Sequence, residues 1–336
     1  RPPRSTPSNS SAASDVYKRQ GYQSFIFPSS LLYYFYFKKL RSFVTTKYWI
    51  NSIVQIDKVF EEAEMGGNAI VVCGKIENIA HIAETKIGHI EKASDITQFK
   101  GYKIPQSSFL SIPHVLWTTD PLRIKILEKM KRVSKSMSEI GWFYQGVCTG
   151  NNKKYVLTDG SHPLSEKVLR GRDVNRYFIN YANLFLIFDK KKMWSNTDES
   201  KLRVKKKILI RQTGDSIIAA YDESGFFVID SLYLFILKEE CHLNLRYILA
   251  LLNSKLMQFV YQFICPEEDR AFAQVKIVNL EPLPIRFIDS FNAVPETESK
   301  LREMKQLYEQ GDFNDILRSV YKYMNSGKRD CSSRGS

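Results

Sequence analysis

Hydrophobic and polar positions follow two patterns along the chain, one near the N-terminus and another from the middle onward. The apolar run from Gly21 to Phe27 is typical of a buried strand. Apolar positions then recur with helical spacing over residues 29–47, and Ser29 or Ser30 is a candidate N-cap. Two further strands are predicted at 49–57 and 68–76. This order of strand, helix, strand and strand favours the last part of an open α/β sheet.

A second helix is predicted to begin near residue 120. Asp120 suits its N-cap, and Pro121 suits its first helical position. The predicted buried stripe consists of Ile126, Met130, Val133 and Met137. Basic residues cover much of the remaining surface. That pattern fits a solvated cationic helix and a phosphate-facing helix equally well, and both interpretations stay open.

From Gly141 the pattern changes to short strands between turn residues, with a hairpin-like turn at Asp222–Gly225. Residues 245–263 predict a strongly apolar helix that packs into a core, with Asn253 and Ser254 satisfying nearby backbone groups. Two last helices are predicted at Glu298–Glu309 and Asp312–Asn325. The predicted fold class is therefore an α/β unit followed by an α+β domain.

The predicted domains are 21–117 for the α/β part with its connection, 118–325 for the α+β domain, and 326–336 for a tail. Residues 1–20 have the composition of a disordered segment and also resemble a translated sequencing-library adapter. They are left out of the fold for that reason. We accordingly expect the native coding sequence to continue upstream of Gly21.

Composition narrows the class of protein. The chain has 336 residues, of which 43% are hydrophobic, so it can form about two domains with real cores. Its five cysteines lie far apart without a CxxC pair, which favours a reducing cytoplasm over a zinc site or a disulfide framework. The most apolar run, from Phe25 to Phe37, is too short to span a bilayer, so we expect no membrane partner.

The excess positive charge is concentrated in the middle of the chain. The formal net charge is +13, and residues 121–220 alone contain 21 basic and nine acidic side chains. A uniform excess would only aid solubility. A local excess is better explained by a binding face for a polyanion, nucleic acid above all.

No complete catalytic centre can be recognised in the sequence. It has no P-loop and no Gly-x-Gly-x-x-Gly fingerprint, and the nearest glycines, Gly146 and Gly150, have a different spacing. The histidines stand singly, without the spacing of metal ligands. The residues by themselves therefore indicate a cytoplasmic protein that binds polyanions.

The segment VLRGRDVNRY, residues 168–177, is the first candidate for that binding. Its forked cations are Arg170, Arg172 and Arg176. Gly171 permits a tight or left-handed backbone that can approach a ligand closely. Asp173 could orient an arginine or accept a hydrogen bond from a cytosine amino group. Alternatively, Asp173 pairs with Arg170 or Arg176 and only stabilises a surface turn.

Two more segments are candidates. Lys153 and Lys154 follow a turn and could contact phosphates, although lysines beside a turn are usually just solvated. The third candidate combines Lys205–Lys207 with the end of the next predicted strand, where alternation projects Arg211 outward. Gln212 could read adenine or could be an ordinary residue at a strand end.

Several segments, taken in order, resemble the C-terminal half of TaqI-like N6-adenine DNA methyltransferases, the group that includes fused type IIG (Eco57I-like) restriction-modification enzymes. The matching segments between Gly21 and Ile285 are GYQSFIFPSSLL, YFKKLRSFV, INSIVQIDKVFEEAEMGGNAIVVCGK, GVCTGNNKKYVL, VLRGRDVNRY, KKILIRQTG, YDESGFFVIDSLYLF, LRYILALLNSKLMQFVY and LEPLPI. Each is weakly specific alone, whereas their common order is fairly specific.

The resemblance implies that 21–117 is the tail of a Rossmann-like methyltransferase sheet and 118–325 is a DNA target-recognition domain. It implies double-stranded DNA as partner, with Lys153, Lys154, Arg170, Arg172, Asp173, Arg176, Arg211 and Gln212 as DNA-binding residues. The family binds S-adenosylmethionine through a glycine-rich loop and acts through an Asn/Asp-Pro-Pro-aromatic tetrapeptide. Neither motif occurs here, so we expect this fragment to bind no cofactor and to be inactive in methylation alone.

Three functions remain open at this point. The chain is a fragment of a site-specific adenine-N6 DNA methyltransferase of a restriction-modification system, with or without a fused or separate nuclease. Alternatively it is a stand-alone DNA-binding specificity subunit. A less favoured third interpretation is an unrelated α/β enzyme whose basic patch binds acidic ligands or lipids.

Overall fold

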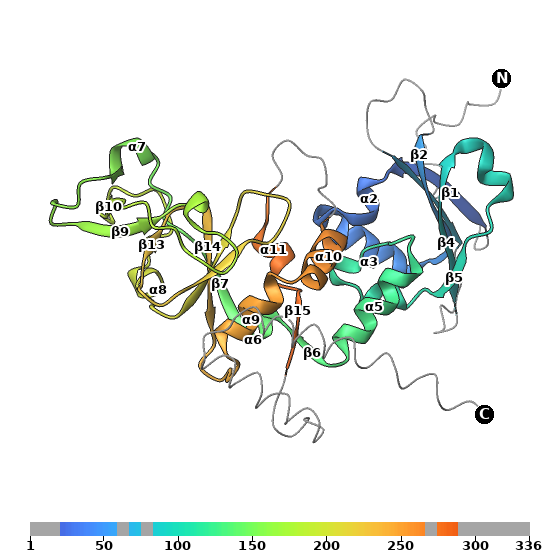
Figure 1. Ribbon diagram of the computed structural model, residues 1–336. Coiled ribbons are helices and arrows are strands. Elements are labelled where there is room, and N and C mark those ends of the chain that lie inside the picture. Colours follow the sequence, from blue (N-terminus) through green and yellow to red (C-terminus); the bar gives the residue numbers. More distant parts are fainter. Residues whose placement is uncertain (1–20, 59–66, 75–82, 266–273, 288–336) are drawn as a thin grey trace, which may run out of the picture. The chain divides into compact units, whose positions relative to one another are not determined.

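The computed structural model describes residues 21–58, 67–74, 83–265 and 274–287 (Figure 1). These residues form two compact units. The first comprises the described residues up to Val133 with Thr213–Ser216 and Leu256–Pro284. The second comprises Ser134–Gln212, Ile217–Lys255 and the described residues from Ile285 on. Domain boundaries at 117–118 and 325–326 stay predictions, and the two predicted C-terminal helices lie outside the described residues.

The first unit contains a five-stranded sheet of order β1-β3-β2-β4-β5. Its strands are β1 (Tyr22–Pro28), β2 (Trp49–Lys58), β3 (Asn68–Gly74), β4 (Glu84–Lys92) and β5 (Tyr102–Pro105). Strand β3 is antiparallel to both β1 and β2, and β4 is parallel to β2. The three strands predicted before residue 77 are thus present. The mixed α/β class is confirmed, whereas a Rossmann-like origin of this sheet stays a prediction.

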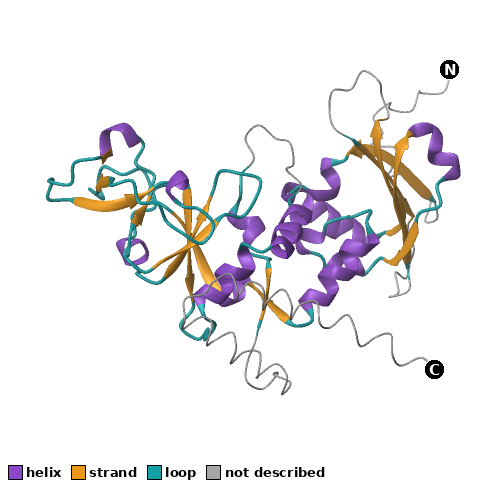
Figure 2. Cartoon of the chain, viewed as in Figure 1, coloured by secondary structure: helices purple, strands orange, loops and turns teal. Residues whose placement is uncertain are grey.

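The helical segment after β1 is broken into three pieces rather than one helix. These are α2 (Ser30–Tyr33), the 3-10 turn η1 (Phe35–Phe37) and α3 (Lys38–Lys47). Figure 2 shows α2 and α3 on one face of the sheet, together with α5 (Pro121–Lys131). The break places the buried side chain of Arg41 where it can reach the backbone of two separate segments.

Arg41 ties the broken helix to a distant turn. Its guanidinium donates to the carbonyls of Leu31 and Tyr34 at 2.6 and 2.9 Å, and to those of Val115 and His114 at 2.9 and 3.0 Å. His114 and Val115 both have a left-handed backbone, with φ of 59° and 54°. Burial lowers the pKa of Arg41 to about 10, which leaves the side chain charged at neutral pH.

Helix α5 begins as predicted but buries a different stripe. The Asp120 carboxylate accepts hydrogen bonds from the backbone N–H groups of Leu122 and Arg123, which confirms the N-cap. The helix ends at Lys131, so Val133 lies outside it and is 49% exposed. Ile124 and Leu127 are the buried residues of the helix. The predicted stripe of Ile126, Met130, Val133 and Met137 is therefore wrong, because the helix is shorter than the pattern suggested.

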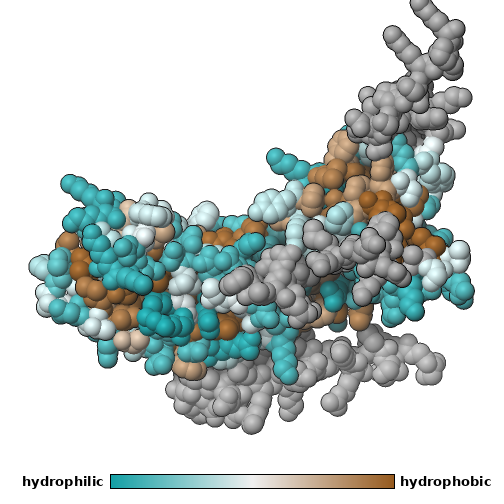
Figure 3. Space-filling model, turned by 90° about the horizontal axis from the view of Figure 1, so that it is seen from above, coloured by the Kyte–Doolittle hydropathy of each residue, from teal (hydrophilic) through white to brown (hydrophobic). Residues whose placement is uncertain are grey.

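Large apolar side chains reach the surface of the first unit (Figure 3). Eight of them come from the segment 22–43: Tyr22, Phe25, Ile26, Phe35, Tyr36, Phe37, Leu40 and Phe43. Strand β1 is an edge strand, and its residues are exposed or half-buried throughout. The prediction of a buried strand at Gly21–Phe27 is therefore right about the strand and wrong about its burial. An apolar surface of this extent is unusual for a folded unit that has no partner.

The second unit is built on two four-stranded sheets. One has the order β12-β11-β14-β7 and the other β13-β9-β10-β8. The strands of the first are β7 (Gly141–Gln145), β11 (Lys207–Arg211), β12 (Ala219–Asp222) and β14 (Leu232–Leu237); those of the second are β8 (Val156–Leu157), β9 (Ser165–Leu169), β10 (Phe185–Ile187) and β13 (Phe227–Val228). The short strands predicted from Gly141 onward are therefore present, and the predicted turn at Asp222–Gly225 connects β12 to β13.

A buried ion pair holds that turn. The Nζ atom of Lys207 lies 3.0 Å from an Asp222 carboxylate oxygen, and both side chains are at most 1% exposed. The carboxylate accepts from the backbone N–H groups of Ser224, Gly225 and Phe226, and Lys207 donates to the carbonyls of Leu202 and Val204. Lys207 is thus excluded as a phosphate contact, although Lys205 and Lys206 remain exposed.

The apolar helix predicted over 245–263 consists of two helices, α9 (Leu245–Leu252) and α10 (Lys255–Ile264). The break falls at Asn253 and Ser254. The Asn253 side chain exchanges two hydrogen bonds with the backbone of Ala219, at 3.1 and 3.0 Å. Asn253 therefore fixes the edge strand β12 rather than a local backbone group, whereas Ser254 donates locally to the Leu251 carbonyl.

Candidate nucleic-acid interface

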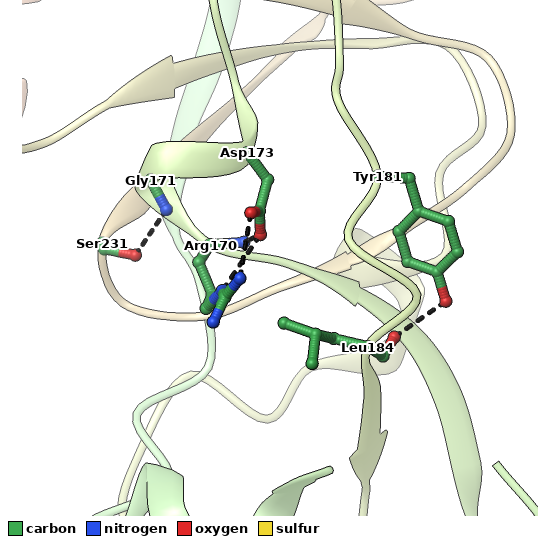
Figure 4. Close-up of polar contacts among 6 residues, drawn as sticks. All are labelled: Arg170, Gly171, Asp173, Tyr181, Leu184 and Ser231. Carbon is green, nitrogen blue, oxygen red and sulfur yellow. Dashed lines mark hydrogen bonds and ion pairs between the residues drawn. The ribbon is translucent and has the colours of Figure 1, made fainter. Parts of the chain in front are cut away.

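The segment 168–177 forms a tight turn that is held by its own aspartate. The turn η4 (Gly171–Asp173) directly follows β9. The Asp173 carboxylate accepts from the Nε and Nη2 atoms of Arg170, both at 3.1 Å, and from the Arg170 backbone N–H at 2.8 Å (Figure 4). The Asp173 side chain is only 5% exposed. The stabilised-turn alternative is therefore the geometry that this pair adopts.

Gly171 provides close approach rather than a left-handed backbone. Its N–H donates to the Oγ atom of Ser231 at 2.9 Å (Figure 4), and a Cβ at position 171 would lie 3.1 Å from the Ser231 carbonyl oxygen. Its φ is not positive. Glycine is favoured here because the turn is pressed against the loop before β14, which leaves little room for a side chain.

The hydrogen bonds of this network include neither of the other two arginines of the segment. Arg172 and Arg176 are exposed, and the ion pairs of the described residues include neither. Arg176 lies in a second turn, closed by a hydrogen bond from the Asn175 N–H to the Phe178 carbonyl. Tyr177 has a φ of 75°, a strained value for a residue with a side chain, and Phe178 is 60% exposed. Strain of this kind tends to persist where a turn presents functional side chains.

The end of β11 reaches the same place. The Gln212 N–H donates to the Ser231 carbonyl at 3.0 Å, while Ser231 Oγ accepts from Gly171. Ser231 thus joins the first and third predicted segments, although it lies 60 residues from Gly171. Sequence reasoning missed Ser231, because a serine between two apolar strands has no distinguishing local pattern.

Arg211 and Gln212 differ in how their side chains are satisfied. The Gln212 side chain hydrogen-bonds the hydroxyl of Tyr233, whose pKa is raised by burial and lowered in part by this bond. The Nε atom of Arg211 is buried, and no acceptor among the described residues is within hydrogen-bonding distance of it. A buried donor of this kind calls for a partner, and an anion is the natural one for a guanidinium.

Lys153 and Lys154 belong to a separate element, the short helix α7 (Asn152–Tyr155). Asn151 caps the helix by accepting from the Lys154 N–H at 3.2 Å. Both lysines are exposed, and Lys154 lies 5.3 Å from the centre of the Tyr155 ring. In Figure 1, α7 is at the end of the β9–β10 sheet, apart from β7 and β14. The structure therefore unites two of the three predicted segments and leaves the third at another part of the unit.

Two further findings concern the described residues as a whole. Among them, no cluster of three or more histidine, cysteine, aspartate or glutamate side chains could hold a metal ion. Their helices are also too short or too polar for any one of them to cross a membrane.

The Arg170–Asp173 turn lies in a region of the chain that is similar to a known protein family. Residues 166–285 match the TaqI-like C-terminal specificity domain. The chain is 23% identical over 342 residues to a Methanocaldococcus jannaschii protein named as a type II restriction enzyme and methyltransferase. That match covers 92% of this chain, which spans only 28% of the length of the relative.

Two solved structures are also similar, at 11% identity each. The type IIG restriction endonuclease BpuSI gives a TM-score of 0.37, and the match covers 90% of this chain and 42% of the BpuSI chain. The type IIL restriction-modification enzyme MmeI in complex with DNA gives a TM-score of 0.40 and covers 88% and 43%. The matched family region contains the Arg170–Asp173 turn, Ser231 and the end of β11. The match of residues 166–285 to the TaqI-like C-terminal specificity domain confirms the resemblance seen in the sequence.

Proposed function

We propose that the second unit reads double-stranded DNA and that the chain is a fragment of a site-specific adenine-N6 DNA methyltransferase of a restriction-modification system. One observation carries the proposal. The Arg170–Asp173 pair fixes a turn that carries the exposed Arg172 and is followed directly by the turn that carries the exposed Arg176, and both lie inside the region that matches the TaqI-like specificity domain.

The chemistry of the turn suits this task. An arginine fork matches the O6 and N7 atoms of guanine or two phosphate oxygens. An arginine fork can read a base only if the protein backbone that carries it is held in place. Phosphate contacts must also fix the register of the duplex. Arg170 supplies the rigidity by pairing with Asp173, which leaves Arg172 and Arg176 as the reading or gripping side chains. In this proposal Asp173 acts through Arg170 rather than on a cytosine.

The end of β11 extends the same surface. Ser231 joins the Arg172 turn to Gln212, and the buried Nε atom of Arg211 needs an acceptor. In this proposal a phosphate oxygen meets the half-buried Arg211 side chain at its accessible part rather than at the buried Nε. Lys205 and Lys206 are exposed just before β11, at the opposite end of the strand from Arg211, and are not assigned to this surface. We assign phosphate contact to Arg211 and leave Gln212 as a positioning residue, since its side chain is bonded to Tyr233.

Methyl transfer itself requires residues outside this chain. Enzymes that methylate a base in a duplex first extrude it into a pocket. The chain lacks both the S-adenosylmethionine loop and the catalytic tetrapeptide, so those steps would belong to a longer protein such as the M. jannaschii relative. The alternative is a stand-alone specificity subunit with a separate catalytic or nuclease partner. A tetrapeptide of the Asn-Pro-Pro-aromatic type encoded shortly upstream of Gly21 decides for the fused enzyme.

The test is duplex binding measured across salt concentration. About six phosphate contacts predict a slope near −5 in a plot of log affinity against log salt. The double variant Arg172→Ala, Arg176→Ala should flatten the slope and abolish any preference for a selected sequence. Lys103→Ala removes a surface cation of the first unit that is paired with Glu84. This control should change neither the salt slope nor the sequence preference. A flat salt response of the unmodified chain would reject DNA and favour a small acidic ligand.

A further inference from the structure

A tryptophan outside the arginine turn is displayed on the surface by a constrained backbone. The Trp194 side chain is 77% exposed, although tryptophan is normally among the best buried residues. The backbone N–H of Trp194 donates to the Cys148 carbonyl at 2.8 Å, and Cys148 forms a β-bridge with Ser195. The backbone around the indole is therefore fixed from both sides.

Glycine at position 150 makes room for that indole. Gly150 has a φ of +72°, and a Cβ there would lie only 2.1 Å from the Nε1 atom of Trp194. The indole thus rests directly on the Gly150 backbone, where any side chain would collide with it. One side of the ring system is covered by this backbone, and the high exposure of the residue means that the rest faces solvent.

Three lysines lie just before this tryptophan in the sequence. Lys190, Lys191 and Lys192 precede it in a turn that Asp189 holds by accepting from the Lys191 N–H at 3.1 Å and pairing with Lys192 Nζ at 3.0 Å. All three lysines are exposed. Only one of them is neutralised by Asp189, so the turn keeps a net positive charge.

The helix α7 adds two more lysines from the other side. Strand β8 pairs with β10 in the register Leu186↔Val156, which brings the end of α7 beside the residues that follow β10. Lys153 and Lys154 on α7 therefore lie on the same part of the unit as the 190–192 turn. We name this region, formed by Gly150, Lys153, Lys154, Lys190, Lys191 and Trp194, the Trp194 surface.

A second exposed tryptophan provides a contrast. Trp142 on β7 is 54% exposed, but Lys238 lies over its ring with Nζ 4.4 Å from the ring centre. The ring of Trp142 is thus occupied by a cation of its own chain. No cation of the described residues lies over the ring of Trp194, so its solvent side is available to another planar group.

We propose that the Trp194 surface is a stacking platform for an unpaired nucleotide of a DNA strand, with the lysines holding the flanking phosphates. Aromatic rings beside a basic groove bind single strands in this way, because every base offers a flat face. Bases inside a duplex are stacked on each other and do not expose that face. The inference rests on the proposed function in taking DNA as ligand. It goes beyond it by assigning a site that reads no sequence and lies apart from the arginine turn.

The test uses the complete chain and a single strand of about 12 thymidines, a length within the site sizes typical of such surfaces. Binding is followed by tryptophan fluorescence and by anisotropy of a labelled strand. Trp194→Ala should weaken binding about tenfold and remove most of the fluorescence quenching. Trp194→Phe should retain affinity within about threefold, since a smaller ring still stacks. Trp142→Ala is the matched control and should bind as the unmodified chain does.

A second variant tests the lysines. Lys153→Ala combined with Lys190→Ala should lower the salt slope of single-strand binding by about 1.4, roughly 0.7 for each lost phosphate contact. The proposal is overturned if Trp194→Ala binds the strand as well as the unmodified chain. It is also overturned if Trp142→Ala loses as much affinity for the strand as Trp194→Ala does. Equal thermal unfolding of all variants excludes misfolding as the cause of any loss.

The same measurements separate this proposal from the proposed function. Arg172→Ala should weaken duplex recognition and leave single-strand binding unchanged. If the unmodified chain binds the strand through Trp194 but binds no duplex, the proposed function fails while the stacking platform stands. If duplex recognition is present and Trp194→Ala has no effect on the strand, only the platform fails. If the chain binds neither, both fail.

Discussion

The guanidinium of Arg170 and the carboxylate of Asp173 form a two-pronged ion pair, with both N–O distances at 3.1 Å. The pair closes a turn of three residues and is mostly hidden from water. Its geometry makes it a scaffold, because the Nε and Nη2 atoms of Arg170 and both Asp173 carboxylate oxygens are used inside the turn. In the proposed function the ligand-facing side chains are the neighbours, Arg172 and Arg176.

Loss of the Asp173 carboxylate should destabilise the second unit. Asp173→Ala removes three hydrogen bonds from a charged acceptor and leaves Arg170 without its partner, so the free energy of unfolding should fall by about 1–3 kcal/mol. Urea unfolding measures it. Asp159→Ala is the control, since Asp159 is exposed and accepts only from Ser161. Equal stability of the two variants would contradict the scaffold.

Loss of Arg172 should affect binding and not stability. If Arg172 reads a base, Arg172→Ala should cost about 1–3 kcal/mol in specific duplex binding and relax the preference at one base pair. An exposed side chain outside any network should change stability by less than about 0.5 kcal/mol. Competition between selected and random duplexes measures the first, and urea unfolding the second. Unchanged affinity and preference would return Arg172 to the role of an ordinary surface residue.

The buried pair of Lys207 and Asp222 should show strong coupling. Lys207→Met leaves the Asp222 carboxylate buried with no countercharge, which typically costs about 3–5 kcal/mol. Replacing both residues with apolar ones of similar size should cost much less than the sum of the single variants. A double-mutant cycle by urea unfolding checks this. Additive costs would mean that the two side chains do not depend on each other.

The stability of the first unit should depend on His114 as the solution is acidified. Burial, followed by the charges of Lys38 and Arg41, lowers the pKa of His114 from 6.5 to about 4. The unfolded chain therefore takes up the proton first as the pH falls. The stabilising contribution is complete above pH 6.5 and is lost progressively toward pH 4.

Variants of two histidines isolate that contribution. His114→Asn keeps a residue that tolerates a left-handed backbone, and it should reduce the loss of stability between pH 6.5 and 4. His242→Asn, at an exposed position, should leave the pH profile of the unmodified chain unchanged. The measurement is the unfolding free energy across this pH range. A profile that is identical in all three proteins would rule His114 out.

Local sequence patterns predicted those features of the fold that depend only on residues close together in the sequence. Asp120 and Pro121 mark the start of α5, because the cap needs only a carboxylate and the free N–H groups next to it. The strands before residue 77 were likewise recognisable from their apolar runs. The sheet was incompletely predicted, since β4 and β5 contain lysines and histidine on their exposed positions and have no clear apolar run.

Contacts between distant residues account for most of what the sequence could not show. The helix expected over 29–47 is interrupted, and Arg41 of its later part binds the carbonyls of Leu31 and Tyr34 before the break and others more than 70 residues away. The candidate site likewise depends on a contact between residues that are distant in the sequence. Its arginines were visible as a charged segment, whereas Ser231, which joins two of the segments, became evident only from the fold.

The edge strand β1 has a practical consequence for anyone who prepares this chain. Within the described residues its second edge carries backbone groups that no neighbouring strand satisfies, and its side chains are largely apolar. Such an edge is a template for another strand, so copies of the isolated chain should aggregate edge to edge as their concentration rises. Dilute samples, or a lysine introduced at the outward-facing Ile26, should keep the copies apart.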